Sequence, residues 1–382
     1  MQGITMVATC LFGLEKLLGE EIDALGCTRI DTMDGRVTFK GELADICRAN
    51  IGLRCAERVF IKLGECRAAT FTELFDGVHA LPWHAWIGAE DAFPVKGHSV
   101  KSKLFSVPDC QKIIKKAVAT RLSEEYGTVR LPETGVKYQI EFFLFKDTAA
   151  FMIDTTGLAL HKRGYRPETV AAPLRETLAA ALVKISRPRE NVLLWDPFCG
   201  SGTIAIEAAM IMQNRAPGLS RSFAAEAFPQ IGAECWKTAR EKARAAVRPT
   251  SFRARATDLD PDCVRITKES ASRAGVADLI ETSVLDARAI RKPIGVRGTI
   301  VTNPPYGERL MTPGDAARLY RAIGPVFRAL EPWQIYILSA ATDFERSYGK
   351  RADKVRKLYN GMIPCYLYQY FKSAPASRSD PR

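Results

Sequence analysis

The chain has 382 residues, a net charge of +12 and 47% hydrophobic residues, which predicts one to three soluble domains. No run of 18 apolar residues occurs and residues 1–13 do not resemble a signal peptide, which argues against a membrane span and against secretion. The ten cysteines form no C-x-x-C pair and only four histidines are present, so we expect reduced thiols, a cytoplasmic protein and no metal site.

The first 158 residues predict an α+β region with a division near residue 65. Helical spacing or a helix start is found at 13–22, 43–50, 71–75 and 108–122. Strand patterns are found at 36–40, 92–95, 137–144 and 150–154, and the last two are expected to pair as a hairpin. From its motifs alone, this half is simply a mixed α+β module.

Basic residues cluster within this neutral half. Residues 1–165 contain 21 Lys and Arg and 21 Asp and Glu, which leaves 34 basic and 22 acidic residues in 166–382. A polyanionic partner is therefore expected, although any single cluster is more often a solvated helix face. The candidate residues for binding this polyanion are Lys96, Lys101, Lys103, Lys112, Lys115, Lys116 and, in the linker that follows, Arg163 and Arg166.

The second half alternates strands and helices, which predicts a parallel, doubly wound sheet. An alanine- and leucine-rich helix is expected at 168–186, with Pro173 near its start. Strands are expected at 191–195, 252–257, 279–284, 299–302 and 333–339, followed by a terminal hairpin within 359–371 and a polar, disordered tail.

A glycine loop organises this second half. A buried strand leads into it and a helix-forming run follows it, and the loop itself reads Asp196, Pro197, Phe198, Cys199, Gly200, Ser201, Gly202 and Thr203. The two glycines allow a sharp turn and a close approach of the backbone to a ligand, at which the helix points its free N–H groups. This context predicts a nucleotide- or nucleoside-binding turn, with a purely structural glycine turn as the alternative.

The nature of the ligand follows from the neighbouring charges. Residues 200–205 fit the dinucleotide pattern G-x-G-x-x-A, but the acid expected about 20 residues later falls in the loop 215–219. Asp196 would also face a pyrophosphate unfavourably. A cationic ligand without phosphates, such as S-adenosylmethionine, suits an aspartate at this place better.

A second motif, Asn303, Pro304, Pro305 and Tyr306, follows the strand expected at 299–302. The prolines end the strand and hold a rigid turn. The Asn303 side-chain oxygen and an adjacent backbone carbonyl can accept both protons of an exocyclic amino group, and Tyr306 offers a face for base stacking. The tetrad is suited to a nucleobase amine that attacks a methyl donor, and a structural proline turn is the alternative.

Together, the glycine loop and the tetrad resemble class I methyltransferases that modify exocyclic amino groups. Three further segments, 161–166, 172–179 and 215–218, are similar to a bacterial family with a THUMP domain. Members resemble the first half of the large-subunit ribosomal RNA guanine methyltransferase, and some carry the label predicted N6-adenine-specific DNA methylase. The resemblance implies a Rossmann-like α/β domain with a mostly parallel seven-stranded sheet, preceded by an α+β region. The implied parts are a ferredoxin-like subdomain (1–65), a THUMP RNA-binding domain (66–158), a linker (159–170), a methyltransferase domain (171–372) and a tail (373–382).

The cofactor implied is S-adenosylmethionine, which would leave as S-adenosylhomocysteine. Open α/β sheets bind ligands at the carboxyl ends of their strands. Asp258 ends the second strand and is expected to accept the ribose hydroxyls, although Asp260 could do so instead. Asp286 ends the third strand and would meet the adenine amino group. Asn303 lies between the cofactor and the substrate amine. Each acid could instead be a helix cap or turn residue.

Three functions fit these patterns. The favoured function is methylation of a guanine 2-amino group in structured RNA, with large-subunit ribosomal RNA as the expected substrate. The tetrad alone also allows adenine N6 methylation of DNA. The third possibility is a non-catalytic RNA-binding ribosome-assembly factor, against which the intact loop and tetrad argue.

Overall fold

The fold is described from a computed structural model that covers residues 3–166, 174–306 and 311–371. By contacts the chain forms two compact units. The first contains Met1–Cys10, Leu18–Leu160 and Gly218–Ala243, and the second contains Leu11–Leu17, His161–Pro217 and Arg244–Arg382. In the described residues, no helix is long and apolar enough to cross a membrane.

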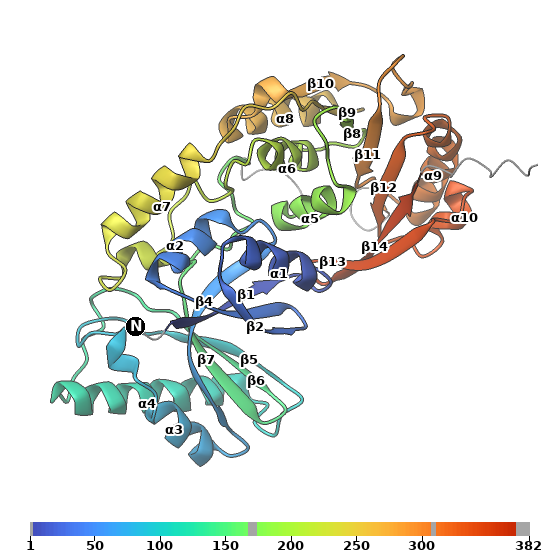
Figure 1. The fold of residues 1–382 in the computed structure, drawn as a ribbon. Helices are drawn as coiled ribbons and strands as arrows, with labels where there is room; N and C mark the ends of the chain where they lie inside the picture. Colours follow the sequence, from blue (N-terminus) through green and yellow to red (C-terminus); the bar gives the residue numbers. More distant parts are fainter. Residues whose placement is uncertain (1–2, 167–173, 307–310, 372–382) are drawn as a thin grey trace, which may run out of the picture. The chain divides into compact units, whose positions relative to one another are not determined.

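The first unit is built on one seven-stranded sheet in the order β2-β3-β1-β4-β7-β6-β5 (Figure 1). All neighbours pair antiparallel except β5 and β6, which are parallel. The strands are β1 (Ile4–Cys10), β2 (Thr28–Met33), β3 (Arg36–Gly41), β4 (Ala56–Arg67), β5 (Val95–Val100), β6 (Ile140–Phe145) and β7 (Thr148–Asp154). β4 pairs with both β1 and β7, so the boundary expected near residue 65 falls within a strand that both halves share.

Five helices accompany this sheet. They are α1 (Glu15–Ala24), α2 (Leu43–Gly52), α3 (Phe71–His79), α4 (Val107–Tyr126) and α7 (Ala233–Ala245). α4 has Pro108 and Asp109 in its first turn and ends at Gly127, whose φ of 61° is the left-handed conformation that favours glycine. Most of α7 belongs to the segment Gly218–Ala243, which we had expected within the methyltransferase domain but which clusters with the first unit.

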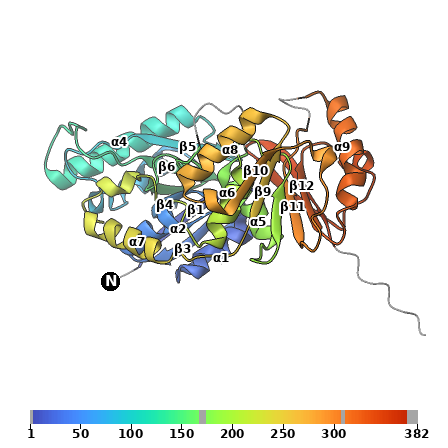
Figure 2. The ribbon, with the colours of Figure 1, turned by 90° about the horizontal axis from the view of Figure 1, so that it is seen from above.

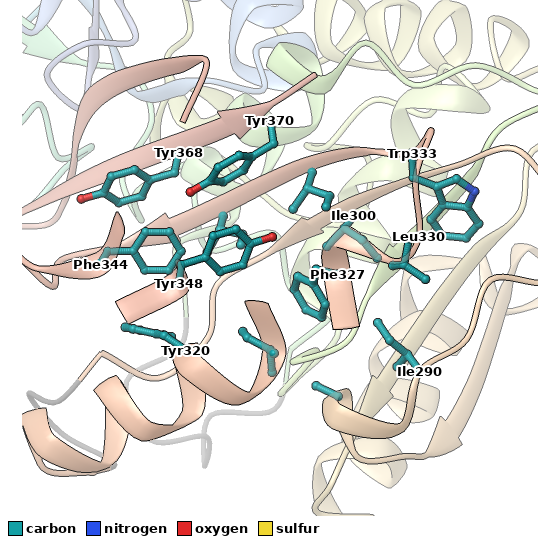
Figure 3. Close-up of a cluster of buried hydrophobic side chains, with 14 of the residues drawn as sticks. Ile290, Ile300, Tyr320, Phe327, Leu330, Trp333, Phe344, Tyr348, Tyr368 and Tyr370 are labelled. Carbon is teal, nitrogen blue, oxygen red and sulfur yellow. The ribbon is translucent and has the colours of Figure 1, made fainter. Parts of the chain in front are cut away.

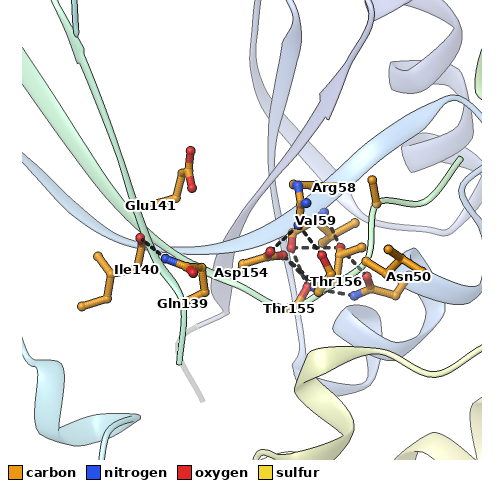
Figure 4. Close-up of polar contacts among 12 residues, drawn as sticks. Asn50, Arg58, Val59, Gln139, Ile140, Glu141, Asp154, Thr155 and Thr156 are labelled. Atoms are coloured by element: carbon orange, nitrogen blue, oxygen red, sulfur yellow. Dashed lines mark hydrogen bonds and ion pairs between the residues drawn. The ribbon is translucent and has the colours of Figure 1, made fainter. Parts of the chain in front are cut away.

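A buried polar network holds the end of β7 (Figure 4). Asn50 donates to the Thr155 hydroxyl at 2.9 Å and accepts from the Thr156 hydroxyl at 2.7 Å. The Asp154 carboxylate accepts from Arg58 and from the Thr156 backbone. Because each of these polar groups is paired, the network pins the chain where it leaves the sheet.

The second unit contains another seven-stranded sheet, in the order β10-β9-β8-β11-β12-β14-β13. Its pairs are parallel except at β14, which runs antiparallel to both β12 and β13. The strands are β8 (Leu193–Asp196), β9 (Ala254–Asp258), β10 (Ile280–Val284), β11 (Gly298–Thr302), β12 (Gln334–Ser339), β13 (Lys354–Asn360) and β14 (Ile363–Tyr370).

Helices cover both faces of this sheet. They are α5 (Glu176–Ser186), α6 (Thr203–Met212), α8 (Pro261–Ala274), α9 (Pro313–Arg328) and α10 (Phe344–Tyr348). α9 lies on one face with α10 packed against it (Figure 1), and α5, α6 and α8 lie on the other (Figure 2). The chain thus has the expected α/β class, with helices alternating around a mostly parallel sheet.

An aromatic core packs beneath α9 and α10 (Figure 3). Phe344 stacks on Tyr368 with ring centroids 4.4 Å apart and meets the Tyr320 ring edge-on at 4.9 Å. Offset and edge-on pairs of this kind stabilise a core beyond the area that they bury. Tyr320 is completely buried, and its hydroxyl group reaches the candidate site described below.

The five strands expected in the second unit match β8 to β12 to within two residues, and the terminal hairpin is confirmed, although it begins at Lys354. The strand expected at 92–95 was misplaced, because Ala92 makes only an isolated bridge and β5 starts at Val95. No prediction was made for β1, β2 or β4. Residues 168–173 of the expected helix, including Pro173, and residues 373–382 of the tail lie outside the described residues.

Candidate active site

The two motifs lie at the carboxyl ends of adjacent parallel strands. β8 ends at Asp196 and β11 ends at Thr302, and β9 flanks β8 on its other side. The helices that follow β8 and β11 cover opposite faces of the sheet (Figure 2). This is the switch point at which open α/β sheets bind their ligands.

One buried hydrogen bond ties the motifs together. The Thr302 hydroxyl donates to the Asp196 carboxyl at 2.6 Å, and the same oxygen accepts from the Phe198 backbone N–H at 3.2 Å. Asp196 is only 1% exposed. Burial raises its pKa to about 7 against the opposing effect of these two hydrogen bonds.

The glycine loop has the backbone shape that its sequence predicts. Gly200 and Gly202 have φ of 52° and 77°. A Cβ at position 202 would lie 2.6 Å from the Thr267 methyl group, so only glycine fits there. The loop is held from β9, because the Thr257 carbonyl accepts from the Cys199 N–H at 3.0 Å. Cys199 is buried, and this burial raises the pKa of its thiol, so the side chain packs as a protonated thiol.

Asp258 and Asp260 have different surroundings. The Asp258 carboxylate accepts from the Gly200 N–H at 2.9 Å, so it lies against the glycine loop. Asp260 is exposed and caps α8 through the Asp262 N–H at 2.8 Å. Asp258 is therefore better placed than Asp260 to reach a ligand on the loop.

Asp286 lies just beyond the end of β10. Its carboxylate accepts from the Arg288 side chain at 2.9 and 3.0 Å and from the Arg288 N–H at 2.8 Å. These bonds lower the pKa of Asp286 and keep the carboxylate ionised. Any ligand of Asp286 would share it with Arg288.

One polar atom of the tetrad has no hydrogen-bond partner, whereas two others are hydrogen-bonded to residues outside the tetrad. The Oδ1 atom of Asn303 is buried and lacks a hydrogen-bond partner among the described residues. The Pro305 carbonyl accepts from the Tyr320 hydroxyl at 2.8 Å, and the Tyr306 hydroxyl accepts from the Asn360 amide at 3.2 Å. A buried acceptor without a partner costs stability, so Asn303 is suited to accept a hydrogen bond from a bound group.

The candidate RNA-binding residues separate into three kinds. Five lysines are exposed and lie on or beside β5 and α4, namely Lys96, Lys101, Lys103, Lys112 and Lys116. Lys115 is occupied within the unit, because it pairs with Glu133 and its Nζ lies 3.6 Å from the centre of the Phe93 ring.

Our assignment of Arg163 and Arg166 to RNA binding is wrong in this structure. The Arg163 side chain is 2% exposed and pairs with the fully buried Glu207. Arg166 donates to the Thr203 hydroxyl at 2.7 Å and to the Leu174 carbonyl at 2.8 Å. The Arg163 guanidinium neutralises a buried carboxylate, which needs a cation beside it, and the Arg166 guanidinium is hydrogen-bonded within the unit.

Four residues that hold the site were not found from the sequence. Thr302 and Thr257 hold the glycine loop, Tyr320 holds Pro305, and Asn360 holds Tyr306. No local pattern marks them, because each acts on a segment far away in the chain. Only the position of Thr302 directly before the tetrad could have drawn attention to it.

The strand order with one antiparallel strand, the glycine loop at the switch point and the Asn-Pro-Pro-Tyr turn together define a Rossmann-like class I methyltransferase. The model of the RMKL-like methyltransferase domain matches residues 163–369, that of the RlmL ferredoxin-like domain matches 5–60, and that of the THUMP domain matches 68–154. The chain belongs to this family of THUMP-containing RMKL-like methyltransferases, and its cofactor is S-adenosylmethionine.

Two relatives show how far the likeness extends. The chain is 42% identical over 385 residues to the putative RNA methyltransferase YpsC of Bacillus subtilis, covering 99% of this chain and 98% of YpsC. It is 34% identical over 381 residues to the ribosomal RNA large subunit methyltransferase K/L of Psychromonas ingrahamii. That match covers 97% of this chain but only half of the K/L protein.

Two solved structures share the whole fold. SMU.472, a putative methyltransferase complexed with S-adenosylhomocysteine, is 39% identical with a TM-score of 0.91 and covers 98% of this chain and all of its own. A protein of Listeria monocytogenes described as a predicted N6-adenine-specific DNA methylase is 42% identical, with a TM-score of 0.91 and 97% of each chain covered.

The buried Asp196 makes stability depend on pH. Between about pH 4 and pH 7 the folded protein keeps a proton on this carboxyl that the unfolded chain has lost. The free energy of unfolding of the wild type should therefore fall over this window relative to Asp196→Asn, by up to about 4 kcal/mol. Denaturant unfolding at a series of pH values, without cofactor, measures the difference.

The exposed Asp278→Asn variant is the matched control and should follow the wild type at every pH. If the curves of the wild type and Asp196→Asn stay parallel from pH 4 to pH 7, the Asp196 carboxyl is ionised throughout and its burial does not dominate its pKa.

Proposed function

We propose that this protein methylates the exocyclic 2-amino group of a guanine in structured RNA, with large-subunit ribosomal RNA as the expected substrate. The buried, unpartnered Oδ1 of Asn303 carries the proposal, because it supplies an acceptor where an amino group would be presented. The matched THUMP domain and the names of the two relatives support RNA over DNA.

The residues present fit the cofactor. The backbone of the glycine loop and the Asp258 carboxylate meet at Gly200, which suits the ribose of an adenosine. We assign Asp286 to the adenine amino group and Asp196 to the end of the pocket nearest the tetrad. When bound, S-adenosylmethionine supplies the electrophilic methyl group.

The tetrad would position the substrate amine. Asn303 Oδ1 and the Pro304 carbonyl would each accept a hydrogen bond from one N–H of the amine, which directs the nitrogen lone pair toward the methyl group, and Tyr306 would stack on the base. The base must be unpaired or flipped out to reach this turn. Catalysis is then mainly positioning and electrostatic stabilisation of the developing charge on nitrogen.

The N-terminal unit is assigned to gripping the RNA. The division into a ferredoxin-like subdomain at 1–65, a THUMP domain at 66–158 and a methyltransferase domain at 171–372 is part of this proposal, as is a cytoplasmic location. Adenine N6 methylation of DNA is the second candidate, since the tetrad suits any exocyclic amine and the Listeria protein carries that description.

Asn303→Ala tests the proposed function directly. The variant should lose methyl transfer by about 100-fold or more, because a positioned acceptor for the amine is removed. Its affinity for S-adenosylmethionine, measured by calorimetry, should stay near that of the wild type, as should that of the exposed control Asn191→Ala. Mass spectrometry of nucleosides should show N2-methylguanosine in RNA treated with the wild type. Methyladenine in DNA, or a parallel loss of cofactor binding in Asn303→Ala, contradicts this assignment.

The variants Asp258→Ala and Asp260→Ala show which of the two carboxylates binds the cofactor and which caps a helix. Asp258→Ala should weaken cofactor binding by about 1–3 kcal/mol, because a hydrogen-bonded charge in the pocket is lost. Asp260→Ala should leave the dissociation constant unchanged and lower stability by about 1 kcal/mol through the lost cap of α8. The reverse pattern would move the ribose role to Asp260.

The exposed lysines of α4 predict a salt-dependent grip on RNA. Lys112→Ala with Lys116→Ala should weaken RNA binding and lower the slope of log affinity against log salt by about 0.7–0.9 for each lost phosphate contact. Lys115→Ala, whose cation is occupied by Phe93 and Glu133, should mainly lower stability. Fluorescence anisotropy across a salt series distinguishes the two, and equal slopes in all three proteins would exclude α4 from the RNA interface.

A further inference from the structure

The tip of the β13–β14 hairpin lies directly beside the tetrad. Asn360, at the end of β13, donates its amide to the Tyr306 hydroxyl at 3.2 Å. Asn360 pairs with Ile363 across a tight turn in which Gly361 has a φ of 68°. Met362, at the tip of that turn, is 93% exposed. The turn therefore places a large apolar side chain in solvent, close to the expected position of the substrate base.

A second segment of the same unit extends this surface. Arg356 of β13 donates to the Gly13 carbonyl at 2.6 Å, which fixes the segment Leu11–Leu17 against the hairpin. The Phe12 ring meets the Tyr359 ring edge-on with centroids 5.6 Å apart, yet Phe12 is 51% exposed. Two aromatic rings and a methionine thus lie close together at one hairpin. Their solvent-exposed faces contribute little to the stability of the fold.

The charges of this surface have one sign. Lys354 and Lys357 are exposed, and the Lys357 Nζ lies 5.4 Å from the centre of the Tyr359 ring. No acidic residue occurs from Lys354 to Phe371. The nearby Glu15 carboxylate accepts from the Gly13 N–H at 3.0 and 3.1 Å, so its charge is partly offset.

We propose that Phe12, Lys354, Lys357, Tyr359 and Met362, here called the hairpin surface, bind the single-stranded nucleotides that flank the target base. The exposed Phe12 ring, the half-buried Tyr359 ring and the Met362 thioether provide faces on which unpaired bases stack, and the lysines meet the phosphates. This inference rests on the proposed function, because it takes the tetrad as the place where the base is held.

The hydrogen bond from Asn360 to Tyr306 connects the hairpin surface to the tetrad. Because Asn360 holds the Tyr306 hydroxyl, a strand that orders the hairpin tip also orders the residue expected to stack on the target base. An apolar protein partner would use the rings and the methionine but would leave the two lysines without a counter-charge. The charge complementarity therefore favours RNA.

Two paired substitutions test the hairpin surface. Phe12→Ala with Met362→Ala should weaken binding of a stem-loop RNA with single-stranded flanks about tenfold or more. Lys354→Ala with Lys357→Ala should lower the salt slope by about 0.7 for each lysine that contacts a phosphate. Ile294→Ala and Lys268→Ala, at exposed positions of the same unit, are the matched controls and should change neither quantity. Cofactor affinity should be unchanged in all variants.

A fully paired RNA of the same length provides the decisive comparison. Its affinity should be insensitive to Phe12→Ala with Met362→Ala, since its bases offer no free faces. Equal losses for paired and flanked RNA, or no loss beyond that of the controls, would overturn the hairpin surface. These are binding measurements, so they stand apart from the proposed function, which fails instead if the wild type forms no N2-methylguanosine.

Discussion

The site depends on the hydrogen bond between Thr302 and Asp196. It joins the ends of the paired strands β8 and β11, which are 106 positions apart in the chain, and the bond itself is buried. A carboxyl in this position costs free energy unless its oxygens are paired, and the Thr302 hydroxyl and the Phe198 N–H supply that pairing. Since the same carboxyl oxygen holds both the tetrad strand and the start of the glycine loop, neither motif can shift without exposing or unpairing Asp196.

The surrounding anchors follow the same principle. Asp258 holds Gly200 of the loop, Tyr320 holds the Pro305 carbonyl, and Asn360 holds the Tyr306 hydroxyl. Each anchor comes from a different strand or helix. The turns are therefore held in place by the packed core of the second unit. Against this background the unpaired Oδ1 of Asn303 is informative, because the neighbouring Pro305 carbonyl and Tyr306 hydroxyl are both anchored while this buried acceptor has no hydrogen-bond partner among the described residues.

The sequence was most informative where local chemistry decides the structure. Gly200 and Gly202 adopt positive φ that other residues rarely tolerate, so the loop could be predicted with its ligand class. The strand β8 was equally clear as an apolar run, and β11 was expected from its place directly before the tetrad. By contrast, β2 is exposed along its entire length and carries no hydrophobic alternation, and β1 and β4 gain their identity from pairing partners elsewhere in the chain.

The same limitation explains the errors over charge. Arg163 and Arg166 look like a basic linker when only their neighbours in sequence are considered, but their partners Glu207 and Thr203 lie on α6. The sequence alone does not distinguish an arginine that binds phosphate from an arginine that neutralises a buried carboxylate. Gly218–Ala243 lies within the residues that the methyltransferase domain model matches, yet by its contacts it clusters with the first unit.

The distribution of charge also bears on how a polyanion would be held. The first 165 residues are neutral, and the basic excess resides in the remainder. If the N-terminal unit alone gripped RNA, the 21 basic residues of that half would act beside 21 acidic ones. Within the proposed function, the phosphate contacts of the α4 lysines would therefore be joined by phosphate attraction close to the tetrad. The acid-free β13–β14 hairpin is then the part of the second unit best suited to guide a flipped base, because its charge and its link to Tyr306 lie on one element.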